Sequence, residues 1–176
     1  MSVELVTTSH GLRMVLFFEN LLFTLLVPGT VAVYVPLWIA RDRPTPAGLP
    51  FVLGSAVLTA GAVLYGWCVF GFAVRGRGTP APVDAPKSLV VWGPYQFCRN
   101  PMYVGVLTVI LVWSVIFESG VLMLYALVVA MSFHLVVVMY EEPCLRRRFG
   151  TDYDDYCRRV GRWLPGGRPG SFPTAR

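Results

Sequence analysis

Uncharged apolar runs alternate with short charged clusters along this chain. The first run covers residues 21–40 and the second residues 49–74, with Arg41 and Arg43 between them. An α-helix needs roughly 20 apolar residues to cross the hydrocarbon core of a bilayer, so each run predicts one membrane-spanning helix. Pro36 should kink the first of these, which membrane helices tolerate when neighbours satisfy the freed carbonyl.

Two further apolar runs follow a long polar segment. Residues 75–100 begin with a Gly- and Pro-rich stretch and predict a loop, and a loop of this length usually has a function. Residues 102–117 reach only about 24 Å as a helix, so either the preceding motif enters the membrane or this helix is recessed. Residues 118–120 predict a tight turn into the fourth run, residues 121–140. The third and fourth helices should therefore form an antiparallel hairpin.

The tail from Glu141 onward has a different pattern, in which apolar residues recur at intervals of four and three. Gly150 should interrupt this helix. We expect its apolar face to lie against the membrane surface or the protein's own polar face. The residues of that face are Leu145, Phe149, Tyr153, Tyr156 and Val160.

Composition supports a membrane protein, because 55% of the residues are hydrophobic and only 14% are charged, against about 25% charged in typical soluble domains. We predict an all-α polytopic membrane protein of about four transmembrane helices with a C-terminal amphipathic cytoplasmic helix. Residues 1–78 would hold two transmembrane helices and residues 79–176 a catalytic-type region, integrated into one membrane domain. The first apolar run is too long for the core of a signal peptide and is expected to be retained.

The net charge of +5 is explained by topology. With four spans, Arg41 and Arg43 lie on one side of the membrane and the other thirteen basic residues on the opposite side. The positive-inside rule then places both termini in the cytoplasm, in a plasma or inner membrane, with anionic lipid as the partner and no nucleic acid. The four cysteines form no CxxC pair, so we expect ordinary small apolar residues and no metal site.

Candidate chemistry is concentrated in two polar segments, residues 93–105 and 140–165, which the hairpin should bring together. Arg99 and Asn100 supply donors at the start of a helix, where backbone N–H groups are also unpaired. Glu141 and Glu142 lie at a helix end that already carries negative partial charge, so a cation must answer them. That cation is either Arg99 or the ammonium or sulfonium of a ligand, and a zwitterionic cofactor would suit the combined site.

Each residue also has an ordinary interpretation in a membrane protein. Arg99 can extend to lipid phosphate, and Tyr95 and Tyr103 can be interfacial aromatics. Glu142 can lie at a helix start, where negative charge is favourable. His134, seven residues before Glu141, is a functional hypothesis as an intramembrane ionisable group, although bonding to a nearby carbonyl is commoner. The meeting of both polar segments at one end of the hairpin favours a functional site.

The landmarks of these segments form a recognisable order: G-P-Y at 93–95, R-N-P-x-Y-x-G at 99–105, E-E-x-x-L at 141–145, F-G at 149–150, Y-x-x-Y at 153–156 and R-x-x-P at 162–165. Over residues 79–165 the chain resembles the isoprenylcysteine carboxyl methyltransferase family and the related membrane phospholipid methyltransferases. The resemblance implies that S-adenosylmethionine binds between the two polar segments, in a pocket roofed by the tail.

By motif position, the resemblance implies a set of cofactor-binding residues. These would be Tyr95, Arg99, Asn100, Pro101, Met102, Tyr103, Gly105, Glu141 and Glu142. The candidate catalytic residues are Glu142 and Arg99, together with His134 and Tyr140, which are proposed from their own position and chemistry as possible bases. Asn100 replaces the histidine of the carboxyl methyltransferases, and the arginine expected shortly before the paired glutamates is missing. The cofactor assignment stands, while the methyl acceptor is open.

Three acceptor classes remain: a hydrophobic or lipidated carboxylate, a phospholipid amine, and a small thiol or other hydrophobic nucleophile. An amine would need a base, for which Glu142, His134 or Tyr140 could serve. The acceptor would reach the site sideways from lipid, and no metal is required. The alternative from another class is a non-enzymatic lipid-binding membrane subunit.

Overall fold

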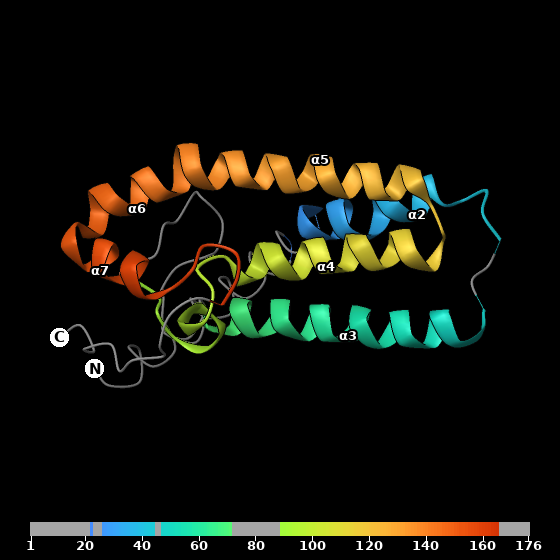
Figure 1. The fold of residues 1–176 in the computed structure, drawn as a ribbon, viewed down its shortest axis with the longest axis horizontal. Helices are drawn as coiled ribbons and strands as arrows, with labels where there is room; N and C mark the ends of the chain where they lie inside the picture. The colour runs from blue at the N-terminus through green and yellow to red at the C-terminus, as the bar shows by residue number, and fades with distance from the viewer. Residues whose placement is uncertain (1–21, 23–25, 45–46, 72–88, 166–176) are drawn as a thin grey trace, which may run out of the picture.

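The computed structural model describes residues 22, 26–44, 47–71 and 89–165, and the secondary structure within them is helical (Figure 1). Those residues form no strand; a single parallel bridge joins Cys98 to Gly161. The elements are the π-helical turn η1 (Thr30–Tyr34), α2 (Val35–Ile39), α3 (Gly48–Gly71), the 3₁₀ turn η3 (Gly93–Gln96), α4 (Pro101–Ile116), α5 (Gly120–Val136), the π-helical turn η4 (Val137–Glu141), α6 (Glu142–Phe149) and α7 (Thr151–Arg159). Most of the loop predicted at 75–100, and the start of the first predicted helix, lie outside the described residues.

The segment η1–α2 packs against α4 and α5, and side chains from those helices satisfy two of its backbone carbonyls. Pro36 has no N–H to donate to the carbonyl of Ala32, and Trp113 Nε1 donates to that oxygen at 3.0 Å. Tyr125 donates its hydroxyl to the carbonyl of Val31 at 2.9 Å, within a π turn that abandons the regular hydrogen-bond pattern. Neighbouring helices thus satisfy the polar groups that the kinked segment leaves open.

Helices α3 and α4 approach closely through glycines, because a residue without a side chain lets two helix backbones come close together. A Cβ atom at Gly61 would lie 3.0 Å from Val109 Cγ2, and one at Gly105 would lie 3.3 Å from the carbonyl oxygen of Gly61. At Gly54 a Cβ would lie 2.3 Å from Ile116 Cδ1. These contacts fix α3 alongside α4 over most of their length.

The predicted hairpin is confirmed, with α4 and α5 packed side by side (Figure 1). The bounds of α4 differ from the predicted run 102–117 by one residue at each end. In the turn, Glu118 has a positive φ of 46°, and the Ser119 hydroxyl accepts a hydrogen bond from the N–H of Leu122 at 3.4 Å. This cap starts α5.

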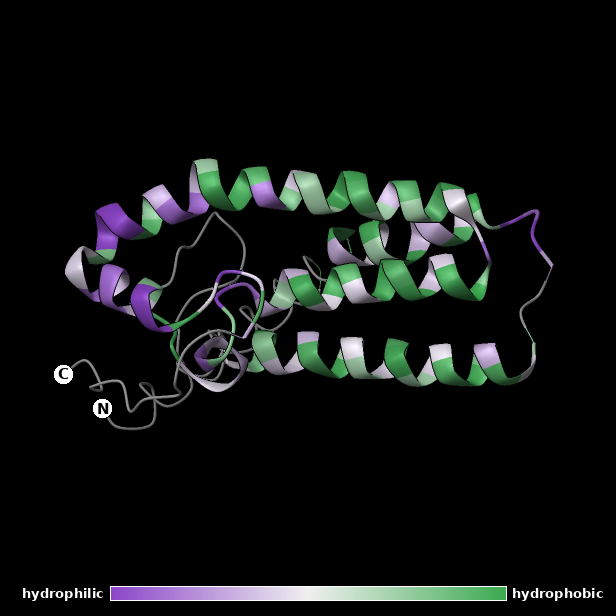
Figure 2. Ribbon diagram, viewed as in Figure 1, coloured by the Kyte–Doolittle hydropathy of each residue, from purple (hydrophilic) through white to green (hydrophobic). Residues whose placement is uncertain are grey.

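The predicted end of the fourth helix near Tyr140 is wrong, because the helix runs on from Gly120 to Phe149. In a regular α-helix, the ring of Pro143 would clash with the carbonyl four residues earlier. The wider π turn η4 accommodates the proline, and the N–H of Glu142 donates to the carbonyl of Val137, five residues back. Figure 2 shows that the same continuous helix changes from apolar along α5 to polar along α6.

Two of the described helices, Gly48–Gly71 and Gly120–Phe149, are long and apolar enough to cross a membrane. Two shorter apolar helices, Thr30–Ile39 and Pro101–Ile116, accompany them. Large apolar side chains are exposed along α3 and α5, including Val63, Phe70 and Leu127. Such a surface is suited to lipid rather than water.

After Gly150, whose φ is 53°, α7 turns back across the end of the bundle. The five residues expected to share one apolar face of the tail do lie together: Tyr153, Tyr156 and Val160 form a buried cluster with Leu145 and Phe149 packed against it. Leu89 and Val91 of the preceding loop also pack there, so this face covers the protein's own loop.

Candidate functional site

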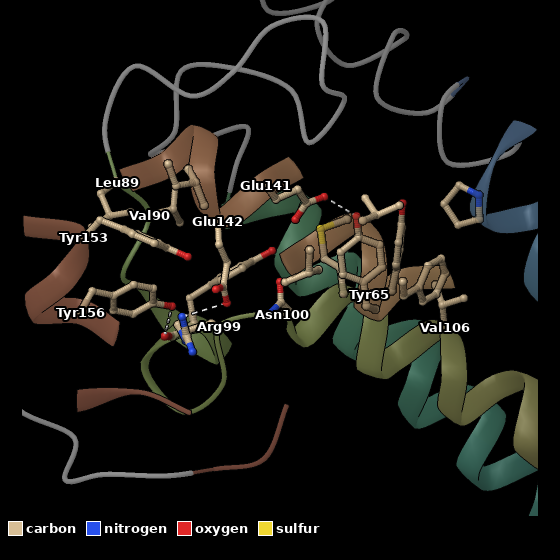
Figure 3. Close-up of a pocket in the computed structure, with 18 of the residues that line it drawn as sticks. Tyr65, Leu89, Val90, Arg99, Asn100, Val106, Glu141, Glu142, Tyr153 and Tyr156 are labelled. Carbon is tan, nitrogen blue, oxygen red and sulfur yellow. Dashed lines mark hydrogen bonds and ion pairs between the residues drawn. The ribbon is translucent and has the colours of Figure 1, made fainter. Parts of the chain in front are cut away.

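A cavity of about 320 Å³ lies at the polar end of the bundle, between the hairpin, the 89–100 loop and α7 (Figure 3). Pockets for small ligands usually have volumes of about 300–1,000 Å³. Most of the lining is apolar, and four charged or amide side chains interrupt it: Arg99, Asn100, Glu141 and Glu142. The two polar segments predicted from sequence therefore meet in one cavity.

Glu142 holds a buried ion-pair cluster. Its side chain is 10% exposed, and its Oε1 accepts from Arg99 Nη1 at 3.1 Å. Arg162 binds the same carboxylate through both oxygens, with Nε 2.6 Å from Oε1 and Nη2 3.0 Å from Oε2. The hydrogen bonds that Arg162 donates to Glu142 raise the pKa of Arg162, so this guanidinium stays charged. Two guanidinium groups, those of Arg99 and Arg162, thus balance the charge of Glu142.

Glu141 has a different environment, although it is the neighbouring residue. The Tyr103 hydroxyl donates to Glu141 Oε1. Within the residues that the structure describes, no arginine or lysine lies within ion-pair distance of Glu141. Figure 3 shows Glu142 directed towards Arg99 and Glu141 directed away from it. The carboxylate of Glu141 lines the cavity without a cationic partner among these residues.

One nitrogen of the Arg99 guanidinium makes no hydrogen bond among the described residues. The side chain of Arg99 is 12% exposed, and Nη1 contacts Cys157 Sγ in addition to Glu142. Its Nε is buried and has no hydrogen-bond partner among the described residues. A buried donor without a partner costs about 1–3 kcal/mol. Because this nitrogen has almost no accessible surface, it is enclosed by protein and does not face the cavity.

Residues 160–163, which we call the strap, run beside residues 98–100 and are hydrogen-bonded to them. Asn100 does not cap α4 with its side chain; instead its Nδ2 donates to the carbonyl of Arg162 at 3.1 Å. The backbone N–H of Arg99 donates to the carbonyl of Gly161 at 2.9 Å, and Cys98 Sγ donates to the carbonyls of Arg162 and Trp163. Burial raises the pKa of the Cys98 thiol, which favours its protonated, donating form.

Seven of the eleven side chains singled out from sequence line the cavity: Tyr95, Arg99, Asn100, Met102, Tyr103, Glu141 and Glu142. The other four lie elsewhere. Tyr140 is 55% exposed on the outside of η4, and Gly105 is buried against Gly61 of α3. Pro101 is buried at the start of α4. His134 accepts a hydrogen bond from Trp163 Nε1 at 3.3 Å, in place of the expected bond to a carbonyl.

Several lining residues were not proposed from sequence as site residues. Tyr153 and Tyr156 were placed on the apolar face of the tail, yet both also line the cavity. The Tyr156 hydroxyl donates to the carbonyl of Tyr95 at 2.7 Å, and burial raises the pKa of Tyr156, which keeps this donor protonated. The Y-x-x-Y spacing of these two tyrosines could have identified them as site residues. The sequence around Val27 and Phe133 could not, because both belong to ordinary apolar runs.

Fold and cavity together define a helical protein with two membrane-type helices and a cavity lined by a carboxylate, Glu141, that has no arginine or lysine partner among the described residues. Residues 49–152 match the sequence model of the phospholipid methyltransferase family, and the chain belongs to that family. The match includes Arg99, Glu141 and Glu142 but stops before most of α7 and the strap.

Two curated proteins are similar to this chain. The nickel-cobalt-cadmium resistance protein NccN of Alcaligenes xylosoxydans xylosoxydans is 32% identical over 117 residues, which cover 65% of this chain and 47% of that protein. Protein-S-isoprenylcysteine O-methyltransferase B of Arabidopsis thaliana is 36% identical over 125 residues, which cover 67% of this chain and 57% of that protein. The chain thus spans about half the length of these relatives.

Proposed function

We propose that this protein is an integral membrane S-adenosylmethionine-dependent methyltransferase acting on a hydrophobic or lipid-linked acceptor. Family membership supports a methyltransferase. The observation that carries the proposal is the cavity itself, which combines apolar walls with the carboxylate of Glu141, for which no arginine or lysine partner is found among the described residues. When bound, S-adenosylmethionine would supply an electrophilic methyl group on a sulfonium.

The residues present fit a zwitterionic ligand. Glu141 would hold a positively charged group, with its carboxylate oriented by the hydroxyl of Tyr103. Arg99, which lines the cavity, and the opening turn of α4 would hold a carboxylate. Glu142 would act indirectly, by positioning Arg99 and Arg162. Its own charge is already balanced by these two guanidinium groups.

An acceptor would reach the cavity from the lipid. Val27 is 49% exposed and Val136 is 45% exposed, yet both also line the cavity, so the cavity opens towards the lipid-facing side between them. The apolar walls would exclude water from the reacting groups. Holding the nucleophile within about 3–3.5 Å of the methyl carbon would supply much of the rate enhancement.

The acceptor class stays within three candidates: a lipid-linked carboxylate, a phospholipid amine or a small thiol. One relative is named as an isoprenylcysteine O-methyltransferase and the family as phospholipid methyltransferases, which favours the first two. If the acceptor is an amine, we propose Glu141 as the base that accepts the proton of the amine. Glu142 is held by two guanidinium groups and is therefore a weaker base, while His134 and Tyr140 do not line the cavity.

We also propose the membrane arrangement. Residues 21–40, α3, α4 and α5 would be four spans of one integrated domain, with 1–78 and 79–176 as its two halves. The tail would form an amphipathic helix on the cytoplasmic side of a plasma or inner membrane, with both termini on that side. The separation of charge supports this arrangement. The described arginines of the tail lie in and after α6 at one end of the bundle, whereas Arg43 donates to the carbonyl of Glu118 in the α4–α5 turn at the other end.

Equilibrium binding of tritiated S-adenosylmethionine to the purified chain tests the cofactor assignment. We expect saturable binding, weakened about 10- to 100-fold by Glu141→Gln, because a charge-assisted hydrogen bond contributes about 1.5–3 kcal/mol. Glu118→Gln is the matched control, since this exposed glutamate lies in the turn at the far end of α4. Absence of binding in the wild-type chain would leave the non-enzymatic lipid-binding subunit as the better account.

Transfer of the tritiated methyl group identifies the acceptor. The reconstituted protein is incubated with total membrane lipid extract, and the labelled products are separated and identified by mass spectrometry. Label in the lipid fraction that is lost in Glu141→Gln and kept in Glu118→Gln supports the proposed reaction. Cofactor binding without any labelled product would contradict it.

A further inference from the structure

The outer face of η4 and α6 carries a group of exposed side chains outside the cavity. Tyr140, Cys144, Arg147 and Arg148 are all exposed, and none of them lines the cavity. Spacings of four and seven residues place Tyr140, Cys144 and Arg147 on one side of a helix. We call these four residues the outer face of α6.

The arginines of this tail fall into two kinds. Arg146 pairs with Asp154 at 2.8 Å and Arg158 pairs with Asp155, so their charges are answered within the tail. Arg147 and Arg148 have no carboxylate within ion-pair distance among the described residues. Arg147 only approaches Cys144 Sγ at 3.9 Å, and Arg148 lies over the ring of Phe149.

The position of these two arginines relates them to the membrane surface. Met139, 73% exposed, and Tyr140, 55% exposed, directly precede α6 at the end of the apolar helix. Tyrosine is enriched at the level of lipid head groups, and arginines just beyond that level meet the phosphate layer. Figure 2 shows this change from apolar to polar along the single helix α5–α6.

We propose that the outer face of α6 is a docking surface for anionic phospholipid head groups. The phosphates would contact Arg147 and Arg148, and the acyl chains would lie along Met139 and Tyr140. The exposed tail arginines Arg146 and Arg158 are paired with aspartates, whereas Arg147 and Arg148 have no carboxylate within ion-pair distance among the described residues and can meet phosphates. This surface is separate from the cavity and does not depend on the cofactor.

Selective lipid retention tests the proposal in nanodiscs of phosphatidylcholine that contain trace spin-labelled phosphatidylglycerol or phosphatidylcholine. Electron paramagnetic resonance measures the motionally restricted fraction of each label. We expect preferential retention of phosphatidylglycerol, reduced about fivefold for each arginine removed in Arg147→Gln/Arg148→Gln. The control Arg146→Gln/Arg158→Gln makes the same charge change at arginines already paired with aspartates, and should keep most of the preference.

Equal retention of the two lipids by the wild-type chain would overturn the proposal. Equal loss in both double variants would also overturn it, by showing that only net charge matters. A nitroxide on the exposed Cys144 provides a second measurement that needs no arginine variant. We expect its collision with dissolved oxygen and with a water-soluble nickel complex to place it at head-group depth. Water-like accessibility to the nickel complex would contradict the docking surface.

Discussion

The two adjacent glutamates show how one position along a helix separates two roles. Glu142 is buried and binds Arg99 and Arg162, whereas Glu141 meets the hydroxyl of Tyr103 and no cation among the described residues. Sequence alone treats them as an equivalent pair. Adjacent residues of a helix point about 100° apart, so one glutamate can face Arg99 and Arg162 while its neighbour faces Tyr103.

Removing the charge of Glu142 should destabilise the fold far more than removing that of Glu141. Glu142→Gln leaves two guanidinium groups without their shared carboxylate, and losing one partner of a buried ion pair costs about 3–5 kcal/mol. Glu141→Gln keeps a hydrogen-bond acceptor for Tyr103 and should cost less than about 1 kcal/mol. Denaturant unfolding in detergent micelles measures both, with Glu118→Gln as the reference. Equal destabilisation by the two variants would contradict the division of roles.

Cysteine reactivity should distinguish the strap contact from the exposed tail. Burial raises the pKa of Cys98, so less thiolate is present at neutral pH and alkylation is slow. Cys144 is exposed and should react first. Because the pKa of Cys98 is raised, its alkylation should begin at a higher pH than is usual for a thiol. Peptide mass spectrometry after timed iodoacetamide treatment measures both rates, and equal rates in the folded protein would contradict the buried position of Cys98.

Among the helices, the contact of α3 with α4 depends on glycines that differ in their surroundings. A side chain at Gly61 meets Val109 Cγ2 at 3.0 Å, whereas one at Gly66 on the same helix meets nothing within 4 Å. Alanine substitutions at the two positions therefore separate the effect of close packing from the effect of helix propensity. The sequence alone does not show which of the two glycines is packed against α4.

Gly61→Ala should destabilise the protein by about 1–3 kcal/mol, because the added methyl group overpacks the contact with α4. Gly66→Ala should be neutral or stabilising by up to about 1 kcal/mol, since alanine favours a helix over glycine. Thermal unfolding of the two variants in the same detergent compares them directly. A loss at Gly66 as large as that at Gly61 would show that α3 does not pack through Gly61.

Hydropathy located the helices well because long apolar runs have few alternatives in a membrane, and α4 ends within one residue of its predicted bounds. The continuation of α5 through Pro143 was missed, since proline normally ends a helix and a π turn has no sequence signature. The meeting of Arg99 with Glu142 followed from the hairpin alone. The sequence could not predict that Val27 lines the cavity. Which residue of an apolar run lines a cavity depends on how whole helices pack.

At the scale of the molecule, the cavity is assembled from segments far apart in the chain. The segment around Val27, Tyr65 of α3, the 89–100 loop, the hairpin and α7 all contribute to its lining. The lining includes exposed apolar residues, such as Val27 and Val136, and also Glu141 and Glu142 where the tail begins. This arrangement suits a water-soluble cofactor and a lipid-borne acceptor that meet at one point.

The proposed orientation places Cys144 on the cytoplasmic side. A membrane-impermeant maleimide should therefore label Cys144 in inverted vesicles and leave it unlabelled in sealed, right-side-out cells or vesicles, because the tail follows the basic side of the bundle. Labelling from the outside alone would reverse the proposed topology.

Direct photo-cross-linking of tritiated S-adenosylmethionine, followed by peptide mapping, tests the central claim most closely. The label should appear on peptides that contain residues 95–103 and 141–156, because these line the cavity from both sides. Excess unlabelled cofactor should abolish it, and the Glu141→Gln substitution should reduce it strongly at a cofactor concentration near the wild-type Kd. Saturable labelling confined to the lipid-facing helix Gly48–Gly71, or labelling unchanged by Glu141→Gln, would show that the cofactor binds elsewhere.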